Sequence, residues 1–455
     1  MYSIVDGLEV EVNVAANPFG LELDQLFGMA ARINKKRGFL FVSKLLGKHI
    51  PVIPSASLGA GAMLGRLYAA KVMRHASSLD ADRVRSVLGS REEADAGYRE
   101  LMAGKIPVQE PTLFIGFAET ATALGHSLFD AFEGSVSFVH TTREEIDGLV
   151  PSIRFEEEHS HAVAHRCYVR DPSVFRDAAR VVLVDDEITT GKTALNIVRE
   201  LHAAFGHRDF VVASLLDWRS EADRARFAEL ERELGVRIRC LALIEGSITV
   251  KGSPLEEGAD GGWEETAPQP GFRLIRHDLS PMFQQAGQPA AGRSSAGSQL
   301  NSYLLHTGRF GMSAADGEAL DREVARAAEY LAERRTGRRI LCLGTGEFMY
   351  VPMRIAHRMG DGAYSQSTTR SPIHPLRREG YAVSSSFRFD AVDGEDVSNF
   401  IYNVEPGMYD EAFVFVERPY DPKRGASFER ALSRIGVPVV HLIFFGGPDE
   451  RRDGE

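Results

Sequence analysis

One segment limits the fold of this chain more than any other. Residues 181–193 read Val-Val-Leu-Val-Asp-Asp-Glu-Ile-Thr-Thr-Gly-Lys-Thr. An unbroken apolar run is typical of a parallel strand buried on both faces, because a half-exposed strand alternates apolar and polar residues. The apolar spacing that follows, at Leu195 and Val198, predicts a helix. The segment is therefore a strand, a loop and a helix of an α/β sheet, with two carboxylates at the end of the strand.

The first half of the chain repeats this pattern. Helical apolar spacing alternates with short β-branched runs, which indicates a parallel sheet covered by helices on both faces. Upstream, we expect a helix entered through a glycine-rich turn at 57–61, so that residues 1–110 extend the same domain. The predicted strands are 112–117, 136–141, 181–185, 210–216 and 236–244.

A second α/β domain is predicted after a linker. Residues 252–299 are rich in glycine, proline and serine, a composition that buries little apolar surface. We therefore divide the chain into a domain at 1–251, a flexible linker at 252–299 with few contacts across it, and a domain at 300–455. A helix is expected to begin after Ser313, whose hydroxyl can accept from the Asp316 amide. Strands are expected at 340–343, 412–416 and 437–444.

The two halves share short matching segments. Leu-Phe-Ile-Gly at 113–116 aligns with Leu-Cys-Leu-Gly at 341–344, and Glu119 then aligns with Glu347. Thr-Thr-Arg at 141–143 falls near the same letters at 368–370. These matches suggest an internal duplication in which the second domain is a degenerate copy. The alternative is the general texture that any two α/β domains share.

Charge and composition exclude several classes of protein. The chain has 53 Lys and Arg against 64 Asp and Glu, a net charge of −11, so we expect no nucleic-acid partner. No apolar run approaches the roughly 18 residues of a membrane helix, so we expect no membrane partner. The N-terminus lacks a signal-peptide pattern, and the cysteines are few and scattered, at 167, 240 and 342. A cytoplasmic location is the resulting expectation.

The loop after the strand at 181–185 is suited to a phosphorylated sugar. Ligands of open α/β sheets bind at the carboxyl ends of the strands. Small residues let several backbone amides converge on a phosphate at a helix N-terminus, and vicinal aspartates can accept from ribose hydroxyls. The Gly-Lys-Thr ending also occurs in P-loops, but a P-loop needs a glycine where this chain has Asp186.

Two further segments carry candidate chemistry. Ala118, Glu119 and Thr120 follow the strand at 112–117 and lead into a helix, where small residues present amides to an anion. Arg143 follows the next strand and can form a bidentate clamp on an anion. A polar stretch then contains His159 and His161, which are candidates for proton transfer. The alternative is an exposed acidic loop with incidental histidines.

The strand, acidic pair and Thr-Thr-Gly-Lys-Thr loop resemble the signature of the type I phosphoribosyltransferases. The resemblance implies that Asp185 and Asp186 bind the ribose hydroxyls of phosphoribosyl pyrophosphate (PRPP). It also implies a 5-phosphate loop at Thr189, Thr190, Gly191, Lys192 and Thr193. Ala118, Glu119 and Thr120 would then form the diphosphate loop, with Arg143 as a clamp and His159 and His161 on a mobile catalytic loop.

The cofactor that the resemblance implies is Mg²⁺, which arrives with the diphosphate and is held largely by substrate oxygens and water. No other metal site is expected, because His159, His161 and His165 lack the spacing of zinc ligands. The expected partners are small molecules, PRPP and a nucleobase-like acceptor, and the family is compatible with a homodimer.

Thr369-Arg370-Ser371-Pro372 resembles the TRSP signature of a domain found C-terminal to phosphoribosyltransferases of tellurite-resistance-type stress gene clusters. Thr369, Arg370 and Ser371 are therefore candidates for binding a different anion, with a purely structural domain as the alternative. The strand at 412–416 ends in Glu417-Arg418 and lacks the acidic pair.

The expected function is the transfer of ribose 5-phosphate between PRPP and a nucleobase-like acceptor, with release of diphosphate, in either direction. The gene-cluster resemblance associates it with biosynthesis of a nucleoside-like metabolite. A PRPP- or nucleotide-sensing regulator that kept the fold without turnover is the alternative from another class.

Overall fold

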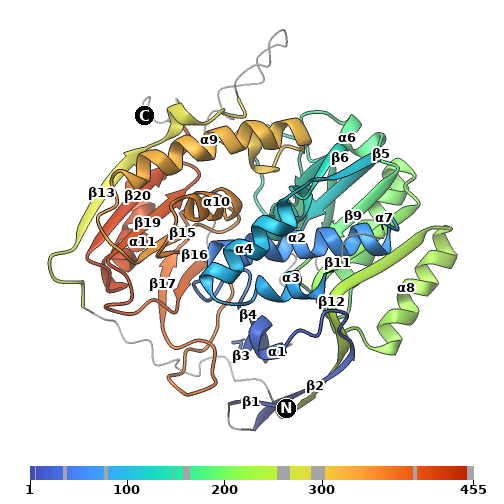
Figure 1. Ribbon diagram of the computed structural model, residues 1–455, viewed down its shortest axis with the longest axis horizontal. Coiled ribbons are helices and arrows are strands. Elements are labelled where there is room, and N and C mark those ends of the chain that lie inside the picture. The colour runs from blue at the N-terminus through green and yellow to red at the C-terminus, as the bar shows by residue number, and fades with distance from the viewer. Residues whose placement is uncertain are drawn as a thin grey trace.

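The computed structural model describes residues 1–5, 7–33, 38–75, 80–146, 148–156, 164–253, 267–287, 303–392 and 397–447. Two α/β sheets lie side by side, the first coloured mainly cyan to green and the second orange to red in Figure 1. The predicted fold class, a parallel sheet with helices and a second α/β domain, is confirmed.

The first sheet has a parallel centre and antiparallel edges. Its main order is β1-β2-β12-β11-β9-β5-β6-β14, and β10 pairs with β11. All five predicted strands are present, at β5, β6, β9, β11 and β12. The strand bounds are β1 Tyr2–Val5, β2 Leu8–Ala16, β5 Ile106–Gly116, β6 Phe132–His140, β9 Arg180–Val184, β10 Glu187–Ile188, β11 Asp209–Asp217, β12 Arg237–Lys251 and β14 Met312–Ser313.

Two hairpins and a set of helices complete the first domain. Right-handed crossovers that leave β5 and β9 in opposite directions put α5 and α7 on opposite faces of the sheet. The hairpins are β3–β4 (Phe27–Ala31, Phe39–Ser43) and β7–β8 (Ile153–Glu156, Ala164–Cys167). The helices are α1 Leu23–Leu26, α2 Pro54–Lys71, α3 Ala81–Ser86, α4 Arg91–Met102, α5 Ala121–Phe129, α6 Ser173–Arg176, α7 Lys192–Phe205 and α8 Glu221–Leu234.

The prediction of a glycine-rich turn at 57–61 is wrong, because these residues lie inside α2. A Cβ on Gly61 would stand 2.3 Å from the Cβ of Ser127 on α5, and one on Gly59 would stand 2.5 Å from Val87. The two glycines therefore allow α2 to pack closely against α5 and Val87, and they do not form a turn. Glycine destabilises a helix interior, and the close packing offsets this cost.

The second sheet is parallel throughout, in the order β13-β20-β19-β15-β16. Its edge strand β13 lies within the segment expected to be a flexible linker, so that expectation is wrong for residues 273–278. The predicted cap of α9 is confirmed, since the Asp316 amide donates to Ser313 Oγ. The bounds are β13 Arg273–Asp278, β15 Ile340–Gly344, β16 Ala363–Ser367, β17 Ser386–Asp390, β18 Ser398–Tyr402, β19 Glu411–Val416, β20 Val439–Phe444, α9 Ala314–Ala332, α10 Tyr350–Arg358 and α11 Pro422–Arg434, with short 3-10 turns at Ser280–Met282 and Leu305–Thr307.

The two sheets share one strand order. Reading from the second strand of each domain, β6-β5-β9-β11-β12 corresponds to β16-β15-β19-β20-β13, although β13 enters from the N-terminal side. Equivalent bonds recur, because Thr141 N donates to Gly116 O and Thr368 N donates to Gly344 O. Each domain also inserts a hairpin, β7–β8 or β17–β18, between its second and third strands. These correspondences support the duplication suggested by the sequence.

The domains share packed cores, contrary to the expectation of few contacts. Leu58 of α2 and Ala123 of α5 belong to the same buried cluster as Leu320 and Tyr350 of the second domain. Strand β14 adds to the first sheet, and α2 and α4 cross the region between the two sheets in Figure 1. The hairpin β3–β4 is also shared, because Val42 packs with Tyr402 of β18.

A buried arginine ties the domains together electrostatically. The Arg309 guanidinium, with a side chain 5% exposed, lies 3.5 Å from Glu144, 3.2 Å from Glu347 and 3.0 Å from Glu417. It also donates to Thr142 Oγ1 at 2.9 Å. Burial alone would lower the pKa of Arg309, but the three carboxylates raise it, so the residue is a permanent cation among charges from both domains.

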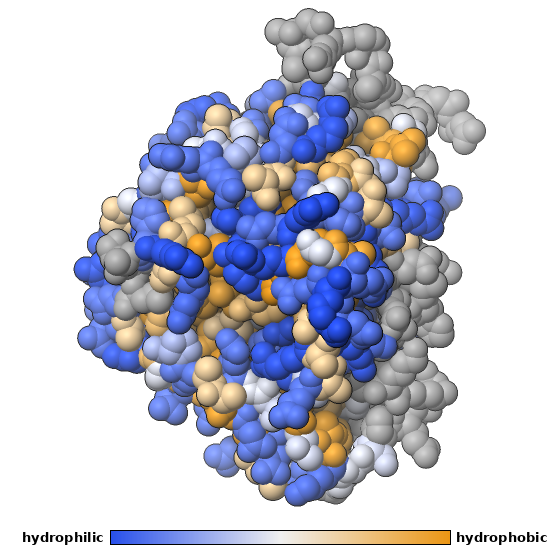
Figure 2. All heavy atoms as spheres, turned by 90° about the vertical axis from the view of Figure 1, so that its right-hand side faces the viewer, coloured by the Kyte–Doolittle hydropathy of each residue, from blue (hydrophilic) through white to orange (hydrophobic). Residues whose placement is uncertain are grey.

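The outer face of the first domain is mostly hydrophilic. Figure 2 shows polar and charged side chains over most of this face, with apolar side chains confined to small patches. Within the described ranges, none of the helices combines the length and apolar character needed to cross a bilayer.

We predict that Arg309→Met lowers the free energy of unfolding by about 3 to 5 kcal/mol, because it leaves buried carboxylates without their cation. Arg322→Met, at an exposed position on α9, is the matched control and should change stability little. Urea unfolding measures the free energy of unfolding of both variants. Equal losses in the two variants would contradict the electrostatic role of Arg309 in joining the domains.

Candidate functional site

Three loops converge at one edge of the first sheet. Gly116, near the end of β5, pairs with Val184 of β9 on one side and with His140 of β6 on the other. The chain continues from these strands into the loops at 117–120, 185–191 and 141–146. The strand order reverses between β5 and β9, and ligands of open α/β sheets bind at such a switch point.

The acidic pair and the small-residue loop lie at the end of β9. Asp185 and Asp186 are half-buried, and the Asp186 amide donates to Asp185 Oδ1 at 3.0 Å. Thr189, Thr190 and Thr193 are half-buried around the start of α7. The acidic pair and the loop are thus continuous in the chain between β9 and α7, and their roles as a ligand site remain predictions.

Gly191 and Lys192 begin α7. Gly191 is the N-cap, has φ +71°, and has no side chain to accept from the first amides of the helix. A Cβ there would stand 2.5 Å from the ring of Phe227, over which the Arg219 guanidinium lies at 4.3 Å. Arg219 is held in turn by Asp217 at 2.7 Å. Phe227, Arg219 and Asp217 thus form a packed layer against the loop that supports its conformation. Only glycine fits at position 191.

A buried ion pair underlies the loop after β5. Lys48, which is 2% exposed, lies 2.8 Å from the carboxylate of Glu119, and Arg143 lies 4.0 Å from the same carboxylate. Burial lowers the pKa of Lys48, whereas the Glu119 charge opposes that shift. The Glu119 carboxylate thus lies between two cations, and the carboxylate of Glu347 is also close enough to act on Lys48. No local pattern indicated Lys48, because the contact joins residues far apart in the chain.

Not every amide of this loop is available to a ligand. The Ala118 amide donates to Thr141 Oγ1 at 2.8 Å, and Thr120 is the half-buried N-cap residue of α5. His165 is buried beside the same threonine, with its Nδ1 2.9 Å from Thr141 Oγ1, which gives it a structural role. The loop therefore offers the amides beyond Ala118.

Arg143 is positioned by the second domain. Its backbone amide donates to Glu347 Oε1 at 3.0 Å, and its side chain is 20% exposed. Burial would raise the pKa of Glu347, but the charges of Arg309 and His140 and the amide of Arg143 outweigh it and lower the pKa to about 2. An ionised glutamate of the second domain therefore fixes the loop that carries Arg143.

The candidate histidines His159 and His161 lie outside the described residues. The strands on either side, β7 and β8, are described and pair as an antiparallel hairpin. Arg166 of β8 bridges to Thr142, so the hairpin is attached to the loop that carries Arg143. The sequence predicted a polar loop in this segment and neither of these strands, and the roles of the two histidines remain predictions.

An apolar pocket lies beside the acidic pair. Its walls include Phe41 from β4, Leu45 and Leu46 from the following loop, and the polar residues Asp186 and Glu187. Strand alternation turns Phe41 toward the first domain and Val42 toward the second. The apolar run Phe-Leu-Phe-Val at 39–42 was visible in the sequence, but nothing local placed it against Asp186, which is 145 positions after Phe41.

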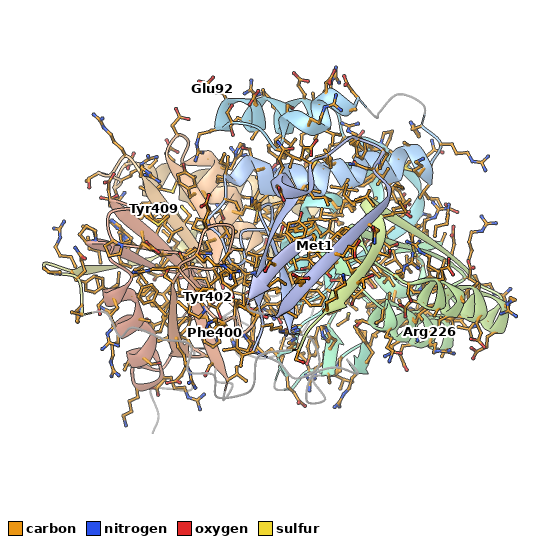
Figure 3. The ribbon with its side chains drawn as sticks, turned by 90° about the horizontal axis from the view of Figure 1, so that it is seen from below. Met1, Glu92, Arg226, Phe400, Tyr402 and Tyr409 are labelled. Atoms are coloured by element: carbon orange, nitrogen blue, oxygen red, sulfur yellow. The ribbon has the colours of Figure 1, made fainter. Side chains whose placement is uncertain are left out.

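The TRSP segment borders a second pocket. Thr369 is buried, and its Oγ1 accepts from the Ser371 amide at 3.1 Å. Ser371 O accepts from Tyr402 OH at 2.8 Å, and Tyr402, labelled in Figure 3, lies where the second domain meets the N-terminal strands. Arg370 lines the pocket, whereas Thr369 and Ser371 shape the turn that presents it.

No group of three or more histidine, cysteine or acidic side chains arranged to hold a metal ion is present in the part of the chain that the structure describes. The carboxylates of Asp185 and Asp186 are oxygen donors of the kind that Mg²⁺ prefers, and they stand at the predicted ligand site.

Comparison with known proteins identifies the two parts of the chain. Residues 26–247 match a family described as phosphoribosyl transferase, and residues 306–432 match the TRSP domain that lies C-terminal to that family. No curated protein matches the chain.

Solved structures with a similar fold include two adenine phosphoribosyltransferases. The Trypanosoma brucei protein is 14% identical over 50% of this chain and 79% of its own, with a TM-score of 0.29. The Giardia lamblia protein is 18% identical over 36% and 84%, with a TM-score of 0.22. Values this low establish no shared function.

We predict that Gly191→Val weakens binding of ribose 5-phosphate about tenfold or more, because its side chain meets the Phe227 ring and displaces the loop. Gly206→Val, at the other end of α7, is the matched control: its φ is +75° and a Cβ there meets nothing within 4 Å. Both variants share the backbone strain, so calorimetry that finds equal losses of affinity would exclude a specific role for the loop.

Proposed function

We propose, since the chain belongs to the phosphoribosyl transferase family and carries its C-terminal TRSP domain, that the first domain transfers ribose 5-phosphate between PRPP and a nucleobase-like acceptor. The observation that carries the proposal is the meeting of the acidic pair, the loop at 189–193 and the loop at 118–120 at the switch point between β5 and β9.

Each loop binds a different part of PRPP. The amides and hydroxyls at 189–193 hold the 5-phosphate, where the N-terminus of α7 favours an anion. Asp185 and Asp186 accept from the ribose hydroxyls. The diphosphate lies against the loop at 118–120, beside the cations Lys48 and Arg143. The adjacency of β5 and β9 supports this order, because a sugar can span the loops that follow two neighbouring strands.

Catalysis depends on charge that develops as the bond at C1 breaks. The leaving diphosphate gains negative charge, which Arg143 and the loop amides stabilise, while Asp185 and Asp186 tolerate positive charge on the ribose. Because Glu347 and Arg166 fix the main chain around Arg143, its guanidinium needs little reorganisation during the reaction.

Mg²⁺ fits this site as a partner of PRPP. The half-buried Asp185 and Asp186 supply oxygen donors, and the ion would neutralise diphosphate charge when bound. No cluster of protein ligands is required, because substrate oxygens and water complete the shell.

The acceptor lies beside Asp186, at the edge of the apolar pocket. Phe41, Leu45 and Leu46 form the buried apolar base beside this position, each 6% exposed or less, and Phe41 is itself held by stacking on Trp218 at 5.5 Å between centroids. Asp186 and Glu187 supply acceptors for ring N–H groups. A nucleobase-like heterocycle has the required combination of an apolar face and polar edges.

We predict that the double substitution Asp185→Asn with Asp186→Asn reduces PRPP turnover by at least about 10²-fold. The thermal midpoint should change little, because both side chains face the ligand space rather than the core. Asp177→Asn, at an exposed position, is the control. Turnover with a panel of bases and PRPP affinity by calorimetry measure the effect. Unaltered affinity and turnover would refute the ribose role, and tight PRPP binding by wild-type protein without any turnover would favour a sensing regulator.

We predict that the double substitution His159→Ala with His161→Ala lowers kcat by about 10²- to 10⁴-fold and changes PRPP affinity less, if either residue transfers a proton. His75→Ala, at an exposed position, serves as the control. Steady-state kinetics with near wild-type values would reduce the histidines to surface residues, and a loss confined to binding would assign them to holding diphosphate.

A further inference from the structure

The second pocket lies in the TRSP domain at the place that corresponds to the first-domain site. Its walls come from the carboxyl ends of β15, β16 and β19 and from the first turns of α11. The strand order reverses between β15 and β19, as it does between β5 and β9. By topology, this is again a switch point at which an α/β domain binds a ligand.

The residues that would bind PRPP are not repeated there. Where β9 ends in two aspartates, β19 ends in Glu417 and Arg418, and Glu417 is held by Arg309 at 3.0 Å. Where α7 begins at a glycine, α11 begins at Asp421, whose carboxylate accepts from the Lys423 amide at 2.7 Å. The amide end of α11 is thus capped by an anion, and the pocket lacks the pair of acceptors for a ribose diol.

The pocket instead gathers guanidinium groups. Arg370 enters from the TRSP turn, Arg418 from the end of β19 and Arg424 from α11, beside Thr345 and the apolar side chains of Phe389 and Val392.

The carboxylates of the pocket are neutralised from within. Glu347 and Glu417 contact the buried Arg309, and Glu144 is bonded to Tyr303 OH at 2.6 Å and to Arg418. Among the wall residues that the structure describes, the arginines, Arg309 included, therefore outnumber the glutamates by four to three.

We propose that this pocket binds a small molecule that carries a phosphate or carboxylate group, held by Arg370 and Arg424, with its apolar portion against Phe389 and Val392. Guanidinium groups suit both oxyanions because their paired N–H donors match two oxygens at once. The ligand differs from PRPP, and it would lie close to the first-domain site, because the wall residue Glu144 directly follows Arg143.

Equilibrium dialysis of the full chain with radiolabelled inorganic phosphate tests the proposal. We expect Gly191→Val to remove phosphate from the first-domain loop and to leave binding in the second pocket. Adding Arg370→Gln and Arg424→Gln should weaken the remaining binding about tenfold or more. Arg430→Gln, an exposed arginine on the same helix α11 that is absent from the pocket wall, is the matched control and should leave it unchanged.

Competition by malonate separates the two ligand chemistries within the proposal. Displacement of the phosphate retained by Gly191→Val assigns a carboxylate-accepting site, and resistance to malonate assigns a phosphate site. If the double arginine variant does not fold, the single substitution Arg424→Gln, at an exposed position, should also weaken phosphate binding in the second pocket, by a smaller factor.

Retention of phosphate by the double arginine variant would overturn the proposal. So would loss of all phosphate binding in Gly191→Val. Phosphate binding that persists in the second pocket while Gly191→Val has no effect would instead count against the first-domain loop, so the two failures are distinguishable.

Discussion

The buried guanidinium of Arg309 is the interaction on which the arrangement of both sites depends. It forms ion pairs with Glu144 in the first domain and with Glu347 and Glu417 in the second. A cation so deeply buried is tolerated only because several carboxylates surround it, and those carboxylates need it equally. Since Glu347 also accepts from the Arg143 amide, the same network that joins the domains positions the residue proposed to hold diphosphate.

The shared strand order shows how one scaffold can serve two ligand chemistries. Both sheets place loops at a switch point, and Thr141 and Thr368 brace these loops in the same way, each donating from its amide to the end of the neighbouring strand and accepting from a loop amide. The differences lie in the residues that follow the strands. Aspartates and an uncapped helix suit a phosphorylated sugar, whereas arginines and a capped helix suit an oxyanion bound by side chains.

Local patterns in the sequence predicted the parallel strands, the α9 cap and the placement of the acidic pair and its loop on one edge, because strand periodicity and capping depend on neighbouring residues. Three features could not be predicted from local patterns in the sequence, each for a physical reason. Strand β13 is a polar edge strand with a mostly exposed pattern inside a glycine- and proline-rich segment. Gly59 and Gly61 look like a turn until their contacts across α2 are known. Lys48 pairs with Glu119 over a separation that no local pattern reports.

The most direct test of the central claim is a crystal structure of the full chain with PRPP and Mg²⁺. The account predicts ribose hydroxyls on Asp185 and Asp186, the 5-phosphate on the loop at 189–193, and diphosphate between the loop at 118–120 and Arg143. PRPP seated in the TRSP pocket, or in the first domain with its phosphate away from α7, would contradict it.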